Sequence, residues 1–227
     1  MISTRIFGTP VKVKLIIFVY IAVLWGIITW LGLYWHPERG FWQGLLIGFV
    51  SWIFLSISDL GHPVAHIFSA RYAKAPMDEI LLSEGMPRTL YWNNDVSPNV
   101  HRMRAMGGLI FNMLALLLSS GIYGIAPSNS LVREWMGWSA FGHGLILVAG
   151  LLPLPMVDGG TILKWTLVAR GKTEAEADAL VRRIDWILGF VFVIAGIGFA
   201  FIKMWIIGLI GIGAGVIILS IAAGKIR

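Results

Sequence analysis

Two histidines and one aspartate lie inside strongly apolar parts of this chain. His62 and His66 are four residues apart in one apolar stretch, and Asp158 lies in another, within Leu-Leu-Pro-Leu-Pro-Met-Val-Asp-Gly-Gly. On a helix, the two histidines are one turn apart along the axis and about 40° apart around it, which lets two imidazoles bind one metal ion. A third ligand must come from another segment, and Asp158 is the candidate.

Two further polar residues accompany this set. Asp59 shares the helix face of the histidines, about 60° from His62 and one turn before it. We interpret Asp59 as a hydrogen-bond acceptor that orients a metal-bound imidazole, because such rings usually donate their other N–H to a carboxylate or carbonyl. A substitute general base and an extra ligand are alternatives that the residues leave open. His143 is predicted to form an interhelical hydrogen bond rather than to bind the metal.

The composition is that of an integral membrane protein. The chain has 227 residues, of which 57% are hydrophobic and only 13% charged, and its mean hydropathy is +0.80. Ionisable side chains are costly at membrane depth, so those that occur there usually mark a functional site. The chain has no cysteine, which excludes thiolate ligands and leaves nitrogen and oxygen ligands for any metal.

Six apolar runs have the length of a membrane-spanning helix. They are 15–35, 41–68, 105–125, 135–152, 184–201 and 205–223. The first run is too long for a signal-peptide core and lacks a small-residue cleavage site, so we expect it to be retained. The second run, and the fourth with the residues just after it, carry the histidines and aspartates. Because buried polar groups in lipid must find one another or a metal, these two helices are expected to be neighbours.

The basic residues alternate between the two sides of these six runs, and one side has 15 of the 18. They are Arg5, Lys12 and Lys14; Arg71, Lys74, Arg88, Arg102 and Arg104; Lys164, Arg170, Lys172, Arg182 and Arg183; and Lys225 and Arg227. The opposite side has Arg39, Arg133 and Lys203. By the positive-inside rule, both termini are predicted to be cytoplasmic. The net charge of +6 forms no dense patch, so we expect membrane lipid and no nucleic acid as a partner.

These observations predict an all-α polytopic membrane protein with about six transmembrane helices, forming a single integral membrane domain over 1–227. Two cytoplasmic connectors are expected, 71–104 and 169–183. In the first, 80–82 and 89–92 are bounded by turn-forming residues, which allows short strands at the cytoplasmic membrane face. In the second, 173–180 predicts a surface helix with Thr173 as its N-cap and acidic residues in its first turn.

Asp158 has helix-breaking residues on both sides. Pro153 and Pro155 precede it, and Gly159 and Gly160 follow it. These residues interrupt the helix where a carboxylate must turn inward. Irregular backbone at membrane depth is tolerated only where it is buried in protein or lines a cavity, so the pattern favours a site inside the protein.

The motif around the histidines resembles that of the site-2 protease family of intramembrane zinc metalloproteases. The family pattern His-Glu-x-x-His, followed by x-x-x-Ala-Arg, is matched at His62, His66, Ala70 and Arg71, with Pro63 in place of the glutamate. A later family pattern, Asn-x-x-Pro-x-x-x-x-Asp-Gly, is matched with one substitution. Its positions here are Gly150 in place of the asparagine, Pro153, Asp158 and Gly159.

A third stretch resembles the family's Gly-Pro-x-x-Asn helix start. It contains Gly107, Gly108 and Asn112, with Leu109 in place of the proline. The likeness covers about 45–164 and implies a three-helix metal-binding core within 41–168, near the cytoplasmic side. It also implies a zinc ion (Zn2+) held by His62, His66 and Asp158, and substrate contacts at Asn112 and at the position of Gly150.

The departures from the family pattern fall on residues that do chemistry. In a zinc peptidase the metal lowers the pKa of its water, and an adjacent carboxylate takes the proton and passes it to the leaving amine. Pro63 can do neither. Pro63 also lacks an N–H, so the carbonyl of Asp59 loses its helical partner and a kink is expected there. Gly150 lacks the amide that, by resemblance, positions the substrate backbone.

Three functional classes follow. The first is a non-catalytic relative of the site-2 proteases, a pseudoprotease that binds a metal and a single-span transmembrane client. The second is an active intramembrane zinc metalloendopeptidase in which Asp59 acts as the base. The third is a metal or proton transporter, which ranks last because no inverted repeat is found and the sixth run has no polar counterpart to the second.

Overall fold

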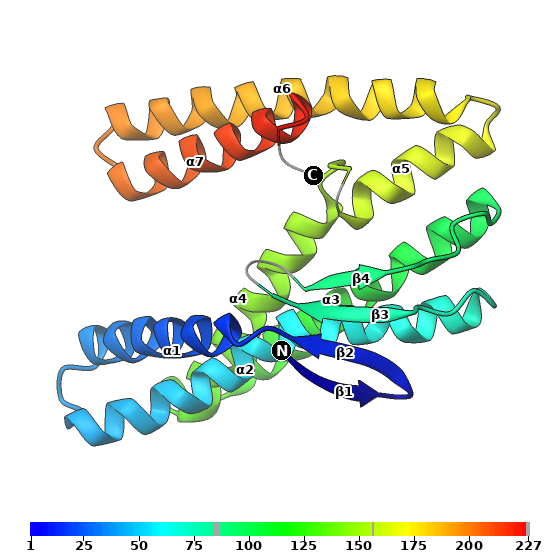
Figure 1. Ribbon diagram of the computed structural model, residues 1–227. Helices are drawn as coiled ribbons and strands as arrows, with labels where there is room; N and C mark the ends of the chain where they lie inside the picture. Colours follow the sequence, from blue (N-terminus) through cyan, green and yellow to red (C-terminus); the bar gives the residue numbers. More distant parts are fainter. Residues whose placement is uncertain (84–86, 156, 226–227) are drawn as a thin grey trace. The chain divides into compact units, whose positions relative to one another are not determined.

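The computed structural model describes residues 1–83, 87–155 and 157–225 (Figure 1). Its helices are α1 Ile16–Trp35, α2 Phe41–Tyr72, α3 Pro98–Ile125, α4 Leu131–Leu151, α5 Asp158–Ala169, α6 Glu174–Phe201 and α7 Trp205–Ala222. Its strands are β1 Ile2–Ile6, β2 Thr9–Val13, β3 Glu79–Leu82 and β4 Arg88–Leu90. The chain forms two compact units, Met1–Gly150 and Leu151–Arg227. The single-domain organisation stays a prediction.

Within the residues that the structure describes, five helices are long and apolar enough to cross a membrane, namely α1, α2, α3, α6 and α7. The protein is thus a multi-pass membrane protein built mainly from helices, as predicted. The fourth predicted run is a helix of 21 residues, α4, but it is not among these five candidates. The physical reason is its composition, because Arg133, Glu134 and His143 dilute the apolar residues.

Helix α4 nevertheless follows α3 along its length. A side chain placed on Gly137 would meet Tyr123, one on Gly144 would meet Leu116, and one on Gly150 would meet Leu109. The residue numbers increase along α4 while those of the contacted residues decrease along α3, so the two helices are antiparallel. The contacts extend over about 20 Å of helix axis. Helix α4 therefore lies against α3 over this length.

A four-stranded sheet in the order β1-β2-β3-β4 belongs to the first unit. Strands β3 and β4 confirm the two strands expected between the second and third spans. Strands β1 and β2 were not predicted, and they form a hairpin in which Ile6 pairs with Thr9. The two residues between them, Phe7 and Gly8, have φ angles of 46° and 77°. Positive φ at both positions of a two-residue loop is typical of a type I′ turn.

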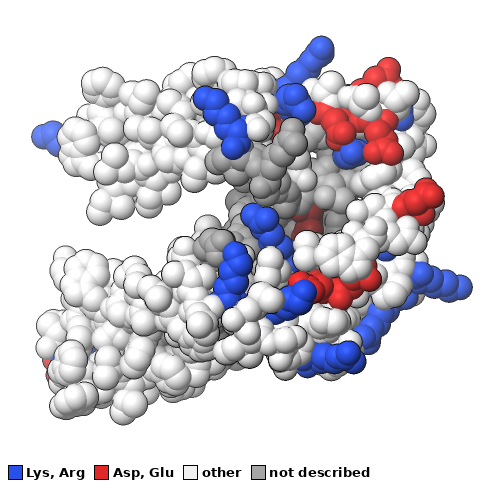
Figure 2. All heavy atoms as spheres, in the orientation of Figure 1, with Lys and Arg blue, Asp and Glu red and all other residues white. Residues whose placement is uncertain are grey.

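The sheet packs on the carboxyl-terminal end of α2. Val11 of β2 and Ile80 of β3 form a buried cluster with Ile67, Ala70 and Met77. Strand β2 pairs in parallel with β3, so the residues before α1 and those after α2 share one sheet. Figure 2 shows charged side chains gathered over the part of the first unit that holds the sheet, whereas the visible face of α1 and α2 has almost none. The charged side chains of the first unit therefore gather at the end that carries the sheet (Figure 2).

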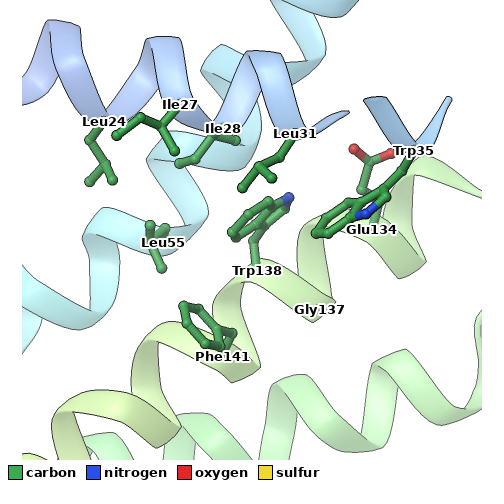
Figure 3. Close-up of a pocket in the computed structure, with 10 residues that line it drawn as sticks. All are labelled: Leu24, Ile27, Ile28, Leu31, Trp35, Leu55, Glu134, Gly137, Trp138 and Phe141. Atoms are coloured by element: carbon green, nitrogen blue, oxygen red, sulfur yellow. The ribbon is translucent and has the colours of Figure 1, made fainter. Parts of the chain in front are cut away.

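An apolar cavity of about 520 Å³ lies between α1, α2 and α4 (Figure 3). Its lining residues are Leu24, Ile27, Ile28, Leu31 and Trp35 of α1, Leu55 of α2, and Glu134, Gly137, Trp138 and Phe141 of α4. The carboxylate of Glu134 accepts hydrogen bonds of 3.1 and 2.7 Å from the guanidinium of Arg39. This bidentate pair keeps a carboxylate tolerable beside an apolar cavity.

In the second unit, the acidic run after Thr173 begins α6. Thr173 is the N-cap, and its side chain and that of Glu176 form a capping box. The predicted helix start is thus confirmed, but the helix does not end before the apolar run. It continues for 28 residues to Phe201, because no proline or glycine occurs between Glu174 and Leu188. The surface helix and the fifth span are one element.

Helices α6 and α7 pack closely through glycines. The position of a Cβ on Gly211 would be 3.0 Å from the Cα of Gly196, and one on Gly215 would be 2.7 Å from the carbonyl oxygen of Gly189. The four-residue spacing of Gly211 and Gly215 is one that lets two membrane helices approach closely.

Candidate metal centre

His62 and His66 point their Nε2 atoms at one another on α2. The two atoms are 3.1 Å apart, and the ring planes are inclined by 77°. Two ligands at 2.0–2.1 Å from a tetrahedral zinc ion are about 3.3 Å apart. The pair therefore has the bite that one metal ion needs, as the four-residue spacing predicted.

The outer nitrogen of His66 is fixed by the backbone of α3. Nδ1 of His66 lies 2.8 Å from the carbonyl oxygen of Arg104 and donates to it. Ser69 donates a second hydrogen bond of 2.9 Å to the same oxygen. Because the ring is only 4% exposed, these contacts set its orientation. They also place the ring proton on Nδ1, so Nε2 carries the lone pair that a metal would use.

Arg104 connects this carbonyl to the segment after α2. Its Nε donates to the carbonyl of Ala75 at 2.9 Å, and its Nη1 donates to the carbonyl of Asn93 at 3.2 Å. The guanidinium also lies 4.3 Å from the ring centre of Tyr91. One buried arginine thus ties the first connector to the helix that orients His66.

The outer nitrogen of His62 contacts an amide of α3. Nδ2 of Asn112 lies 2.8 Å from Nδ1 of His62, and Oδ1 of Asn112 lies 2.7 Å from Nδ1 of His143 on α4. Asn112 is 0% and His143 is 1% exposed. The predicted interhelical hydrogen bond of His143 is therefore confirmed, and it joins a chain that ends at a candidate metal ligand.

Glycines give the imidazole of His62 its space. A Cβ on Gly108 would lie 2.5 Å from Nε2 and 2.6 Å from Nδ1 of that ring. One on Gly107 would lie 2.6 Å from the carbonyl oxygen of Ala65. Helices α2 and α3 approach closely here because α3 has no side chain at two successive positions.

Asp158 lies in the second unit as the first residue of α5. Its position at a helix start favours a carboxylate, because the first backbone N–H groups carry partial positive charge. The backbone before it is folded tightly. A Cβ on Gly159 would clash with the carbonyl of Leu151, and one on Gly160 with the carbonyl of Leu154. These glycines permit the break that the sequence predicted. The role of Asp158 as a metal ligand stays a prediction.

Comparison with known proteins finds similarity in sequence to a zinc metalloprotease and in structure to a site-2 protease. The chain is 31% identical over 123 residues to the zinc metalloprotease RasP of Geobacillus kaustophilus, a match that covers 50% of this chain and 28% of that protein. The site-2 protease from Methanocaldococcus jannaschii has a similar structure, with a TM-score of 0.56 over 94% of this chain and 93% of that one, at 17% identity. The chain therefore has the fold of a site-2 protease, and 123 of its residues are similar in sequence to a zinc metalloprotease. No family model matches it.

The family's glutamate position is a proline in the interior of α2. Pro63 is buried, and the helix continues through it from Phe41 to Tyr72. Asp59 is half-buried one turn before His62, within electrostatic range of it. The sequence suggested Asp59 as the partner of an outer imidazole nitrogen. In the structure, Nδ1 of His62 contacts Asn112 and Nδ1 of His66 contacts the carbonyl of Arg104. The role of Asp59 as a substitute base stays a prediction.

Two other departures from the family pattern touch one another. A Cβ on Gly150 would lie 2.9 Å from Cδ2 of Leu109 and 3.8 Å from Cε1 of His62. Leu109, which replaces the family's proline, thus fills the space that a side chain at position 150 would need. The substrate contacts expected of Asn112 and Gly150 stay predictions.

Sequence reasoning missed Arg104 as the residue that orients His66. The partner of His66 is a backbone carbonyl, which every residue has, so the sequence does not identify it. The packing of α2 against α3 is needed to find it. A buried arginine at the head of an apolar run was the one available hint.

Proposed function

We propose that this protein binds one zinc ion through His62, His66 and Asp158 and holds a transmembrane helix of a client without cleaving it. The observation that supports it best is the facing pair of imidazoles, 3.1 Å apart, each with its outer nitrogen already bonded. Two imidazoles and one carboxylate, with one position open, suit zinc.

The loss of cleavage is inferred from Pro63. Peptide hydrolysis at such a centre needs a carboxylate beside the metal to move protons. Proline offers no acid, no base and no N–H. The retained histidines and the missing glutamate together favour a binding protein over an enzyme.

The client and the orientation belong to the same proposal. The match covers only 28% of the length of the zinc metalloprotease RasP, so the activity of that protein is not carried over to this chain. The single-span client is proposed from the membrane setting of the site. Both termini are proposed to be cytoplasmic. Support comes from the sheet, which joins β2 to β3, and from the 15 basic residues expected on that side.

Metal analysis of the purified protein tests the centre. We expect close to one equivalent of zinc in the wild type and loss of zinc in His66→Ala and in Asp158→Ala. Asp178→Ala, on the exposed start of α6, is the matched control and should keep its zinc. Full zinc retention in the His66→Ala and Asp158→Ala double variant would remove these residues from the site.

Cleavage of a panel of transmembrane peptides tests the absence of activity. We expect a silent wild type and some recovery in Pro63→Glu, since a positioned general base contributes roughly 10²- to 10⁴-fold. Zinc-dependent cleavage by the wild type that is lost in Asp59→Asn, with zinc still bound, would overturn the proposal. That result would instead support the second functional class, an active peptidase in which Asp59 is the general base.

A further inference from the structure

The hydrogen bonds behind His62 have a definite direction. His66 donates from Nδ1 to the Arg104 carbonyl, so its Nε2 has a lone pair and accepts from Nε2 of His62. His62 therefore has a lone pair on Nδ1, which accepts from Nδ2 of Asn112. Oδ1 of Asn112 in turn accepts from His143, whose proton lies on Nδ1.

We infer that metal binding reverses this chain and that His143 is a positioning residue for the metal. The inference rests on the proposed metal site. When His62 uses the lone pair of Nε2 as a ligand, its proton lies on Nδ1. That N–H needs an acceptor, but the atom that faces it, Nδ2 of Asn112, is a donor.

A half-turn of the Asn112 amide resolves the conflict. Oδ1 then accepts from His62, and Nδ2 donates to His143. His143 must now accept through Nδ1, so its own proton lies on Nε2. Both rings stay neutral throughout. His62 moves its proton from Nε2 to Nδ1, and His143 moves its proton from Nδ1 to Nε2.

The side chain at position 143 must therefore donate in one state and accept in the other. Histidine can do both by changing tautomer, and glutamine can do both by turning its amide. Phenylalanine fills a similar space but can do neither. Because Asn112 and residue 143 are buried, phenylalanine at position 143 would leave Nδ2 of the turned amide without an acceptor, which is costly. It would also remove the contact that holds this amide toward His62 in the metal-bound state.

Zinc affinity separates these side chains. We expect His143→Phe to bind zinc about 10-fold more weakly than the wild type, the lower end of effects seen for outer hydrogen bonds at metal sites, measured by competition with a chromogenic chelator. His143→Gln should restore most of the affinity. His101→Gln is the control, because Nε2 of His101 hydrogen-bonds to the carbonyl of Asn94 in the connector. Equal affinity of His143→Phe and wild type would overturn the inference.

The tautomers themselves can be read in the unmodified protein. Nitrogen NMR of histidine-labelled wild type should show His143 protonated on Nδ1 without zinc and on Nε2 with zinc, and His101 unchanged. Zinc bound with His143 still protonated on Nδ1 would overturn the inference and leave the metal site standing. No zinc bound at all would overturn the proposed function itself.

Discussion

The imidazole of His62 fits against a position on α3 that has no side chain, Gly108. We predict that Gly108→Ala weakens zinc binding by about 10-fold or more, because the new methyl group would overlap the ring at 2.5 Å from Nε2. The measurement is zinc affinity of the purified variant.

The matched control lies on the same helix. Gly121 of α3 has nothing within 4 Å of an added Cβ, so Gly121→Ala should leave zinc affinity unchanged and favour the helix slightly. If both variants lose zinc equally, the effect comes from the helix and not from the ring.

Leu109 and Gly150 should be energetically coupled, because Cδ2 of Leu109 lies 2.9 Å from the place of a Cβ at position 150. We predict that Gly150→Asn alone lowers the melting temperature, and that Leu109→Ala reduces this loss. The coupling should be about 0.5–3 kcal/mol in a double-mutant cycle. Gly144→Asn combined with Leu109→Ala should be additive, since Gly144 faces Leu116. Additive effects at Gly150 would contradict the contact.

At the residue scale, the sequence predicted that His62 and His66 face one another, and it missed what holds them. A four-residue histidine spacing has one meaning on a helix, so His62 and His66 could be placed without the fold. The partners of their outer nitrogens come from α3 and depend on how two helices pack. Asn112 was expected to contact substrate, and the structure gives it His62 and His143 as neighbours.

At the element scale, the start of α6 depends on its capping box. We predict that Thr173→Ala destabilises the first turn by about 1 kcal/mol, because Thr173 then no longer accepts from the backbone of Glu176. Hydrogen exchange at residues 174–178 is the measurement. Glu176→Gln should change exchange little, since glutamine also serves in this motif. Equal protection in wild type and Thr173→Ala would contradict the role of the cap.

The helices with the longest apolar runs were the easiest to predict from the sequence. Helices α1, α2, α3, α6 and α7 each contain an apolar window, and a long apolar run has few other interpretations. The position of helix α4 is set by its contacts with α3, and these contacts cannot be inferred from composition. The hairpin of β1 and β2 is five residues per strand, and only its alternation and Gly8 could have suggested it.

At the scale of the whole molecule, the partition of basic residues predicts a topology. Reporter fusions after Arg104 and after Arg183 should read cytoplasmic, and fusions near Arg39 or Arg133 should read external. The result near Arg133 decides whether α4 crosses the membrane, because α4 begins just beside it. A cytoplasmic signal there would reduce the six predicted crossings.

The parallel pairing of β2 with β3 sets an order of events during synthesis. Strand β2 is made before α1 and α2, but its partner β3 is made after both. A two-stranded hairpin is marginal alone, so the amino-terminal strands gain their partner only after the first pair of membrane helices exists. If α1 failed to insert, β2 and β3 would face opposite sides of the bilayer and could not pair. The sheet thus cannot form on a chain in which only one of the first two helices crosses the membrane.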